Sequence, residues 1–180
     1  MTQTVCESAK LPITADTPAA ERDRTKSLSE IVKVLEGCSV FSKLPEDEIQ
    51  TITALFRIES YDAGGIIFRQ GDLGQGIYLI KEGQVSLERE VDLGNSTATV
   101  TVTLLGRCRL LGCHSCLLGE CGRLTETAVC QKPTQLISVE ARELRAVFER
   151  NPQFAINLLK KLCYVLHDRL RGAYGAMDAL

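Results

Sequence analysis

Histidine is scarce in this 180-residue chain, which contains only His114 and His167. The two residues lie on separate predicted elements, so they cannot together form the histidine-rich metal site of a small catalytic β-protein. We therefore expect a protein that is not an enzyme.

Long apolar runs and an excess of charge are also missing. No stretch approaches the roughly 18 consecutive apolar residues that a membrane-spanning helix needs, and residues 1–12 lack the apolar segment of a signal peptide. The formal net charge of −2 offers no general attraction to nucleic acid or to a membrane surface. These absences predict a cytoplasmic protein without a membrane partner.

Cysteine, in contrast, is abundant. The chain has eight cysteines, although persistent structural disulfides are unusual in the cytosol. Five of them fall within residues 108–130, namely Cys108, Cys113, Cys116, Cys121 and Cys130. This cluster is the most unusual local feature of the sequence.

Local patterns divide the chain into three parts. Residues 1–25 are polar and lack periodicity, which predicts a disordered leader. Residues 26–142 begin with two helices, the first capped by Ser27 and ended by Gly37, the second with Pro45 at its first position, and continue as β-structure. Residues 143–180 are predicted to contain helices and a short tail.

Residues 64–90 alternate three short apolar runs with glycine turns. The runs IIF, IYLI and VSL are rich in β-branched, aromatic or aliphatic residues, and glycine, which tolerates positive φ, interrupts them. This pattern predicts β-hairpins. Further strands are predicted at 98–105, where threonine alternates with valine and leucine as in a half-buried strand, and at 127–130 and 135–139, followed by a helix at 141–150.

The string AGGIIFRQGDLGQGIYLIKEGQV, which starts at Ala63, resembles the opening of cyclic-nucleotide-binding domains of the catabolite-activator and FNR type. The resemblance implies a mainly β fold with flanking helices. That fold is a double-stranded β-helix, or jelly roll, with N-terminal helices and a long C-terminal dimerisation helix. The ligand does not follow from the fold, because functional sites vary on a common scaffold.

A longer helix is predicted from Pro152, after Asn151 as its cap, to about residue 171. Apolar residues recur along it at three- and four-residue steps. One interpretation is a helix that packs on its own β-roll. The resemblance favours a second one, a homodimer through residues 152–171, with a seam formed by Ala155, Leu159, Leu162, Leu166, Leu170 and Tyr174.

Transcription regulators of this family carry a helix-turn-helix domain after the long helix, whereas this sequence closes with YGAMDAL. We therefore expect no direct DNA binding. The chain resembles the effector half of such a regulator, and a separate protein partner is expected to receive its signal.

In family members that bind cyclic nucleotides, a cassette of the form L-G-x-G-x-x-F-G-E holds the ligand. Its glutamate grips the ribose hydroxyl, and an arginine shortly before A-T-V pairs with the phosphate. Residues 105–113, LGRCRLLGC, resemble this cassette with Cys108 for the second glycine, Leu111 for phenylalanine and Cys113 for glutamate. Either Thr125 or, after an insertion, Arg123 takes the place of the arginine.

Without the carboxylate and with the arginine position in doubt, cyclic AMP and cyclic GMP are predicted not to bind. The alternative is a genuine cyclic-nucleotide binder, in which Arg123 and the backbone N–H groups after Gly112 hold the phosphate. The candidate ligand-binding residues are Gly112, Cys113, His114, Ser115, Arg123 and Thr125.

The spacing Cys108-x4-Cys113-x2-Cys116-x4-Cys121 places four thiols on a glycine-containing loop. Four thiolates suit zinc or an iron–sulfur cluster. Two alternatives stay open: the cysteines are small core hydrophobes, or two of them form a reversible disulfide switch. His114 lies inside the loop, where it is either a further ligand or a solvent-facing residue.

The sequence as a whole predicts a non-enzymatic, dimeric regulatory or sensor module. In the predicted mechanism, an event in residues 107–126 shifts the packing of the following long helix and changes the dimer or partner surface. A cysteine-ligated metal or iron–sulfur redox subunit is the alternative.

Overall fold

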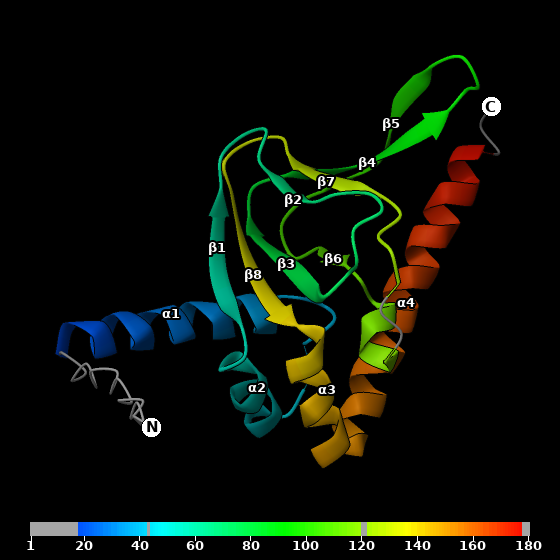
Figure 1. Ribbon diagram of the computed structural model, residues 1–180. Helices are drawn as coiled ribbons and strands as arrows, with labels where there is room; N and C mark the ends of the chain where they lie inside the picture. Colours follow the sequence, from blue (N-terminus) through cyan, green and yellow to red (C-terminus); the bar gives the residue numbers. More distant parts are fainter. Residues whose placement is uncertain (1–17, 43, 120–121, 178–180) are drawn as a thin grey trace, which may run out of the picture.

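Two four-stranded antiparallel sheets form the centre of the protein (Figure 1). The computed structural model describes residues 18–42, 44–119 and 122–177, and the side chains of residues 25–42, 44–119, 122–168 and 170–172. The sheet orders are β1-β8-β3-β6 and β2-β7-β4-β5. The strands are β1 Arg57–Tyr61, β2 Ile66–Phe68, β3 Gly76–Glu82, β4 Val85–Asp92, β5 Thr97–Leu105, β6 Leu110–Gly112, β7 Thr127–Cys130 and β8 Thr134–Glu140. Strands distant in sequence, such as β1 and β8, are paired, and the predicted jelly roll is confirmed.

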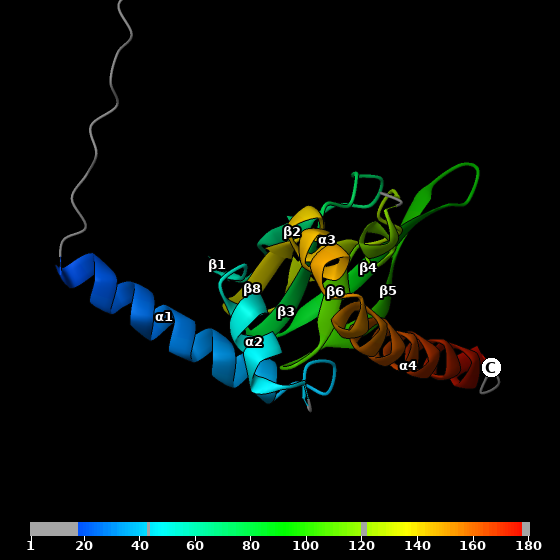
Figure 2. The same cartoon turned by 90° about the horizontal axis from the view of Figure 1, so that it is seen from below.

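Helices flank this roll. They are α1 Pro18–Glu36, α2 Glu46–Thr53, the short 3-10 helix η1 Ser115–Leu118, α3 Ala141–Arg150 and α4 Pro152–Met177. In Figures 1 and 2, α1 and α4 extend from opposite sides of the roll. None of the helices in the described ranges is long and apolar enough to cross a membrane.

Most predicted element boundaries agree with the structure, and the differences have physical reasons. The prediction that Ser27 begins the first helix is wrong, because α1 already begins at Pro18, within the predicted leader. The first helical position suits proline, which has no N–H to leave unpaired, and Ser29 donates its hydroxyl to Lys26 O within the helix. At the other end, α4 continues to Met177, beyond the predicted end near residue 171.

The prediction that 98–105 is a half-buried strand is also wrong. β5 is at the edge of its sheet, paired with β4 alone. Val100, Val102 and Leu104 alternate along it, and each is about half exposed (50–53%). The alternation therefore predicts a strand correctly, but no other described part of this chain packs against the apolar face of β5.

The protein has two apolar cores. The first, here called the roll core, lies between the two sheets and contains Ile80, Val85, Leu111, Leu136 and neighbouring residues. The second, here called the helix core, joins the ends of β3, β6 and β8 to α1, α2, η1, α3 and α4. Because the helix core is continuous, the segment around β6 and the long helix α4 share one packed interior.

The turn between β3 and β4 depends on Gly83. This residue has φ of 110°, and a Cβ there would lie 2.3 Å from Thr134 Oγ1 and 2.7 Å from Thr134 Cα. Thr134 is almost fully buried (1% exposed), so it cannot move aside. Gly83→Ala should therefore lower the free energy of unfolding, measured by urea titration, by at least about 2 kcal/mol.

Gly94→Ala is the matched control for this variant. Gly94 also has a positive φ, 87°, but a Cβ there would meet no atom within 4 Å. We expect a loss of only about 1 kcal/mol, from the strained φ alone. Equal losses in the two variants would contradict the proposed steric role of Thr134.

Candidate functional site

The cassette-like segment runs from the end of β5, through a tight turn, into β6 and η1. Backbone hydrogen bonds attach it to β3: Cys108 N–H donates to Ile80 O at 2.8 Å, and Cys113 N–H donates to Gly76 O at 3.1 Å. Cys108 has φ of 60°, a left-handed conformation that glycine adopts more easily. The backbone thus keeps the conformation expected of the glycine that Cys108 replaces in the family cassette.

Two glycines allow the end of β6 to approach the start of β3 closely. Gly112 has φ of 106°, and a Cβ on it would lie 2.5 Å from Gly76 O. A Cβ on Gly74 would lie 2.2 Å from Cys113 Cβ and 2.8 Å from Cys113 Sγ. Cys113 therefore occupies space that exists only because residue 74 lacks a side chain.

The thiols of Cys113 and Cys116 face each other beneath this contact. Their sulfurs are 2.6 Å apart, and Cys116 Sγ is 2.7 Å from Gly74 O, its hydrogen-bond acceptor. Cys113 Sγ also lies 3.3 Å from Ser115 Oγ. Cys113 is 6% exposed and Cys116 fully buried, so the pair lies just below the surface.

The downstream candidates Arg123 and Thr125 use their polar groups elsewhere. The backbone near Arg123 runs beside the cassette, where Gly74 N–H donates to Gly122 O at 3.0 Å. The exposed Arg123 guanidinium, however, donates to Gly71 O at 2.6 Å. The hydroxyl of Thr125, also exposed, donates to the Glu126 carboxylate at 2.7 Å.

The fold and the cassette can now be compared with known proteins. Residues 58–151 match the family model of the cyclic nucleotide-binding domain. This chain belongs to that family. The cyclic AMP receptor protein of Thermus thermophilus is 35% identical over 146 residues, which are 81% of this chain and 63% of the relative. The chain thus spans about three fifths of that relative's length.

Solved structures show the same fold. A cyclic nucleotide-binding domain from Methylobacillus flagellatus superposes with a TM-score of 0.72 at 18% identity, covering 86% of this chain and 84% of that one. The regulatory subunit of a cAMP-independent protein kinase A from Trypanosoma brucei superposes with a TM-score of 0.62 at 18% identity, covering 78% of this chain and 48% of that one. The family therefore accounts for the fold of the domain, and the ligand has to be argued from the site.

In this cyclic nucleotide-binding domain, the predicted set of four cysteine ligands is not brought together as the spacing suggested. Cys108 and Cys113 bond to Ile80 and Gly76, four residues apart on one strand, which corresponds to about 13 Å. Among the described residues, no group of three or more Cys, His, Asp or Glu is placed to hold a metal ion. Cys121 lies outside the described residues, so ligation of a metal by Cys113, Cys116 and Cys121 stays a prediction.

Cys108 has a different neighbour, which sequence reasoning missed. Its side chain packs on the helix core and lies near enough to the thiol of Cys38, a buried residue that follows α1, to raise the pKa of that thiol. Nothing in the sequence signals this pair, because seventy positions separate its members and no motif spans them. Four of the six described cysteines are thus grouped as two pairs in different places.

The two pairs differ electrostatically. Burial raises the pKa of Cys38, and the neighbouring Cys108 thiol raises it further. Burial also acts to raise the pKa of Cys113, but hydrogen bonds from Cys116, from Ser115 and from backbone groups outweigh it, and the net pKa of Cys113 is lowered. Cys113 is therefore the better-stabilised thiolate of the two.

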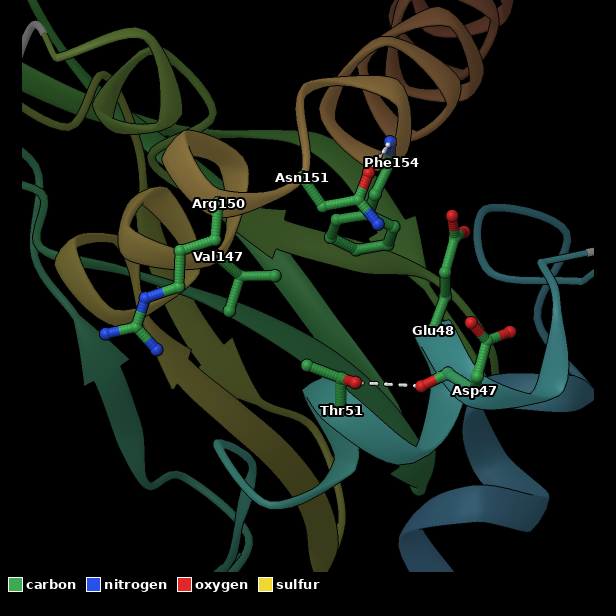
Figure 3. A pocket seen from close by; sticks show the side chains of 7 residues that line it. All are labelled: Asp47, Glu48, Thr51, Val147, Arg150, Asn151 and Phe154. Carbon is green, nitrogen blue, oxygen red and sulfur yellow. Dashed lines mark hydrogen bonds between the residues drawn. The ribbon is translucent and has the colours of Figure 1, made fainter.

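A small cavity lies away from the cassette, where α2 meets the junction of α3 and α4 (Figure 3). Its volume is about 180 Å³. Burial raises the pKa of Glu48 at its rim, and the neighbouring Asp47 raises it further. Asn151 accepts the Phe154 N–H at 3.1 Å, as predicted for the cap of α4. The lining residues are Asp47, Glu48, Thr51, Val147, Arg150, Asn151 and Phe154.

The raised pKa of Cys38 predicts how stability depends on pH. The unfolded thiol loses its proton near pH 8.5, while the folded one keeps it, so stability is full below that pH and falls above it. For reduced protein, the loss attributable to Cys38 should reach about 2 kcal/mol by pH 10. Urea titrations from neutral pH to pH 10 should show a shallower fall for Cys38→Ala than for wild type.

Cys163→Ala is the control, since Cys163 is exposed on α4. Its pH dependence should match that of the wild-type protein. Parallel curves for wild type and Cys38→Ala would show that the buried thiol does not resist ionisation.

Proposed function

We propose that this domain is a non-enzymatic regulatory module that does not use cyclic AMP or cyclic GMP as its effector. The observation that carries the proposal is the position of Cys113. Where the family cassette has a ribose-binding glutamate, this chain has a thiol that faces Cys116 and the backbone of Gly74.

The ribose grip is missing for two reasons. A thiol forms weaker hydrogen bonds than an ionised carboxylate, which accepts strong bonds from hydroxyls. The Cys113 side chain is also 6% exposed and surrounded by protein atoms. A ribose hydroxyl that came to rest here would lose its bonds to water without an equivalent partner.

The phosphate grip is weak as well. The Arg123 guanidinium donates a hydrogen bond to Gly71 O, and the Thr125 hydroxyl donates one to the Glu126 carboxylate. An ionised Glu126 close to the arginine position would repel a cyclic phosphate. Binding through Arg123 and the backbone N–H groups after Gly112 is the competing possibility, in which the guanidinium N–H groups not bonded to Gly71 O would hold the phosphate.

Aliphatic and aromatic side chains also fill the space between the sheets. Leu111, which replaces the cassette phenylalanine, is 1% exposed within the roll core. Phe68 and Tyr78 pack beside it with ring centroids 5.8 Å apart. This packing supports a roll that is stable without a ligand in its interior.

A melting experiment with cyclic nucleotides tests the proposal. A ligand at about a hundredfold excess over its Kd stabilises the folded state by about 2.7 kcal/mol. For a domain of this size that corresponds to a rise in Tm of about 5–10 °C. With millimolar cyclic AMP or cyclic GMP, we expect a shift below about 1 °C, because neither grip is in place.

The Thermus thermophilus cyclic AMP receptor protein is the positive control under the same conditions. A clear rise in Tm for this chain would contradict the proposal. In that case Arg123→Gln should abolish the shift if Arg123 is the phosphate ligand.

The output of the module is proposed to be α4, which presents two apolar faces. Phe154, Leu158 and Leu162 are buried in the helix core. A second row follows the steps three, four, three and four of a two-helix seam; four of its members are exposed and one, Leu159, is half-buried against the helix core. Its members are Ile156, Leu159, Cys163, Leu166 and Leu170.

This second row supports the predicted homodimer through residues 152–171 and changes the expected seam. Leu162 belongs to the buried face, and the side chain of Tyr174 lies outside the described residues. A helix with an uncovered row of this spacing is stabilised when a second copy packs against it. The same surface is available to a separate protein partner.

Cross-linking through Cys163 tests the dimer. Cys163 is the central residue of the row, so two-fold pairing centred there brings the two thiols together with the helices parallel or antiparallel. Oxidation with copper phenanthroline should give a disulfide-linked dimer on a non-reducing gel. Cys163→Ala should stay monomeric on that gel.

A second variant provides the matched control. Tyr164 is 73% exposed and lies about a third of a helical turn away from the row, so Tyr164→Cys in the Cys163→Ala background should not restore the cross-link. Cross-linking that is equal in all three proteins would reject the row as the seam.

A further inference from the structure

The sulfurs of Cys113 and Cys116 are in contact, 2.6 Å apart, and both residues are buried. The pair has no role in the proposed function as stated so far. The inference below deepens that function by naming the event that α4 reports, and it rests on α4 being the output.

We propose that Cys113 and Cys116 are a redox-active dithiol, which a hydroperoxide converts to a disulfide, and that this disulfide changes the packing of α4. The site stands where related domains bind a nucleotide. Its substrate class is thus a small oxidant in place of a nucleotide.

The local geometry favours this reaction. Cys113 directly follows β6 and Cys116 lies in η1, in a C-x-x-C spacing in which two thiols are close enough to bond. Their sulfurs are 2.6 Å apart, near the 2.05 Å of a disulfide bond. Ser115, which is exposed, borders Cys113 on the outer side. A molecule as small as hydrogen peroxide therefore has a short path to Cys113.

The chemistry balances in two steps. The Cys113 thiolate attacks one peroxide oxygen, the O–O bond breaks, and Cys113 sulfenic acid and hydroxide form. Cys116 then attacks the Cys113 sulfur and expels the sulfenic oxygen as water, with the thiol protons taken up by the two oxygens. The two thiols lose two electrons, and the peroxide is reduced to two molecules of water. A dithiol reductant reverses the change by exchange.

Oxidation alters a hydrogen bond in the helix core. Cys116 has one S–H, for which Gly74 O and Cys113 Sγ are both acceptors, and the disulfide removes that donor. It also ties η1 covalently to the end of β6. The reduced and oxidised forms therefore differ in how η1 packs against its neighbours. A switch needs such a difference between two states.

Packing connects η1 to α4. η1 lies against α3, and Leu117 of η1 shares the helix core with Phe148 of α3 and Phe154 of α4. The rings of Phe148 and Phe154 are 5.7 Å apart and edge-on. A shift of η1 is thus transmitted through α3 to the first turns of α4.

Peptide mapping of the full chain tests the disulfide. Reduced protein is freed of reductant, treated with stoichiometric hydrogen peroxide, alkylated and digested with trypsin. Cleavage after Arg109 and Arg123 releases residues 110–123, which contain Cys113, Cys116 and Cys121. We expect this peptide to lose two hydrogen atoms and keep one alkylated thiol, at Cys121, and dithiothreitol should reverse the change.

Variants assign the bond. Cys121→Ala should still form the disulfide, whereas Cys116→Ala should not. Cys116→Ser, which keeps a donor for Gly74, replaces the alanine variant if that variant does not fold. Absence of the disulfide, or a bond that uses Cys121, overturns the inference. Zinc that co-purifies with the protein and protects both thiols from peroxide also overturns the inference.

Hydrogen exchange tests the regulatory part. Oxidation should change the exchange rates of residues 152–168 by at least about fivefold, the lower range of coupling between sites, and Cys116→Ala should show no change after the same treatment. A disulfide that leaves these rates unaltered overturns control of α4. None of these failures affects the nucleotide or cross-linking results, so the inference and the proposed function can fail separately.

Discussion

The close contact between the start of β3 and the end of β6 is the constraint on which the candidate site depends. Gly74 and Gly112 each leave space that a Cβ would fill. Because of this contact, the Cys113 side chain lies against the backbone of Gly74 and is directed toward Cys116. Cys113 is thus held inside the protein by backbone packing.

The helix core extends the effect of that contact. It contains the two thiols, η1 and the buried face of α4, and densely packed interiors transmit displacement because they cannot absorb it in voids. The roll core, in contrast, is closed between the sheets. The cassette therefore lies at the boundary between the two cores, with Leu111 in the roll core and Leu110 and Cys113 in the helix core.

Features determined by neighbouring residues were predictable from the sequence. The strands β2, β3 and β4 follow from apolar runs separated by glycines, but the prediction that these runs pair as hairpins is wrong, because β3 lies in one sheet and β2 and β4 lie in the other. The bounds of α3 agree with the prediction, and Asn151 does cap α4. Features that depend on distant contacts were not predictable. The exposure of β5 follows from its edge position, and the salt bridge between Glu30 and Lys81 joins α1 to β3 across fifty residues. For the site, the substitution at Cys113 was readable, but its pairing with Cys116 and that of Cys108 with Cys38 required coordinates.

Two positions of the cassette differ in the substitutions they tolerate. Cys108 adopts a left-handed backbone conformation at a cost of about 1 kcal/mol relative to glycine. Cys108→Gly would relieve this strain and remove the contact between the Cys108 and Cys38 thiols. Gly112 has no such freedom, since any side chain would collide with the carbonyl of Gly76. The backbone therefore constrains the two positions unequally: it does not need a cysteine at 108, but it does need a glycine at 112.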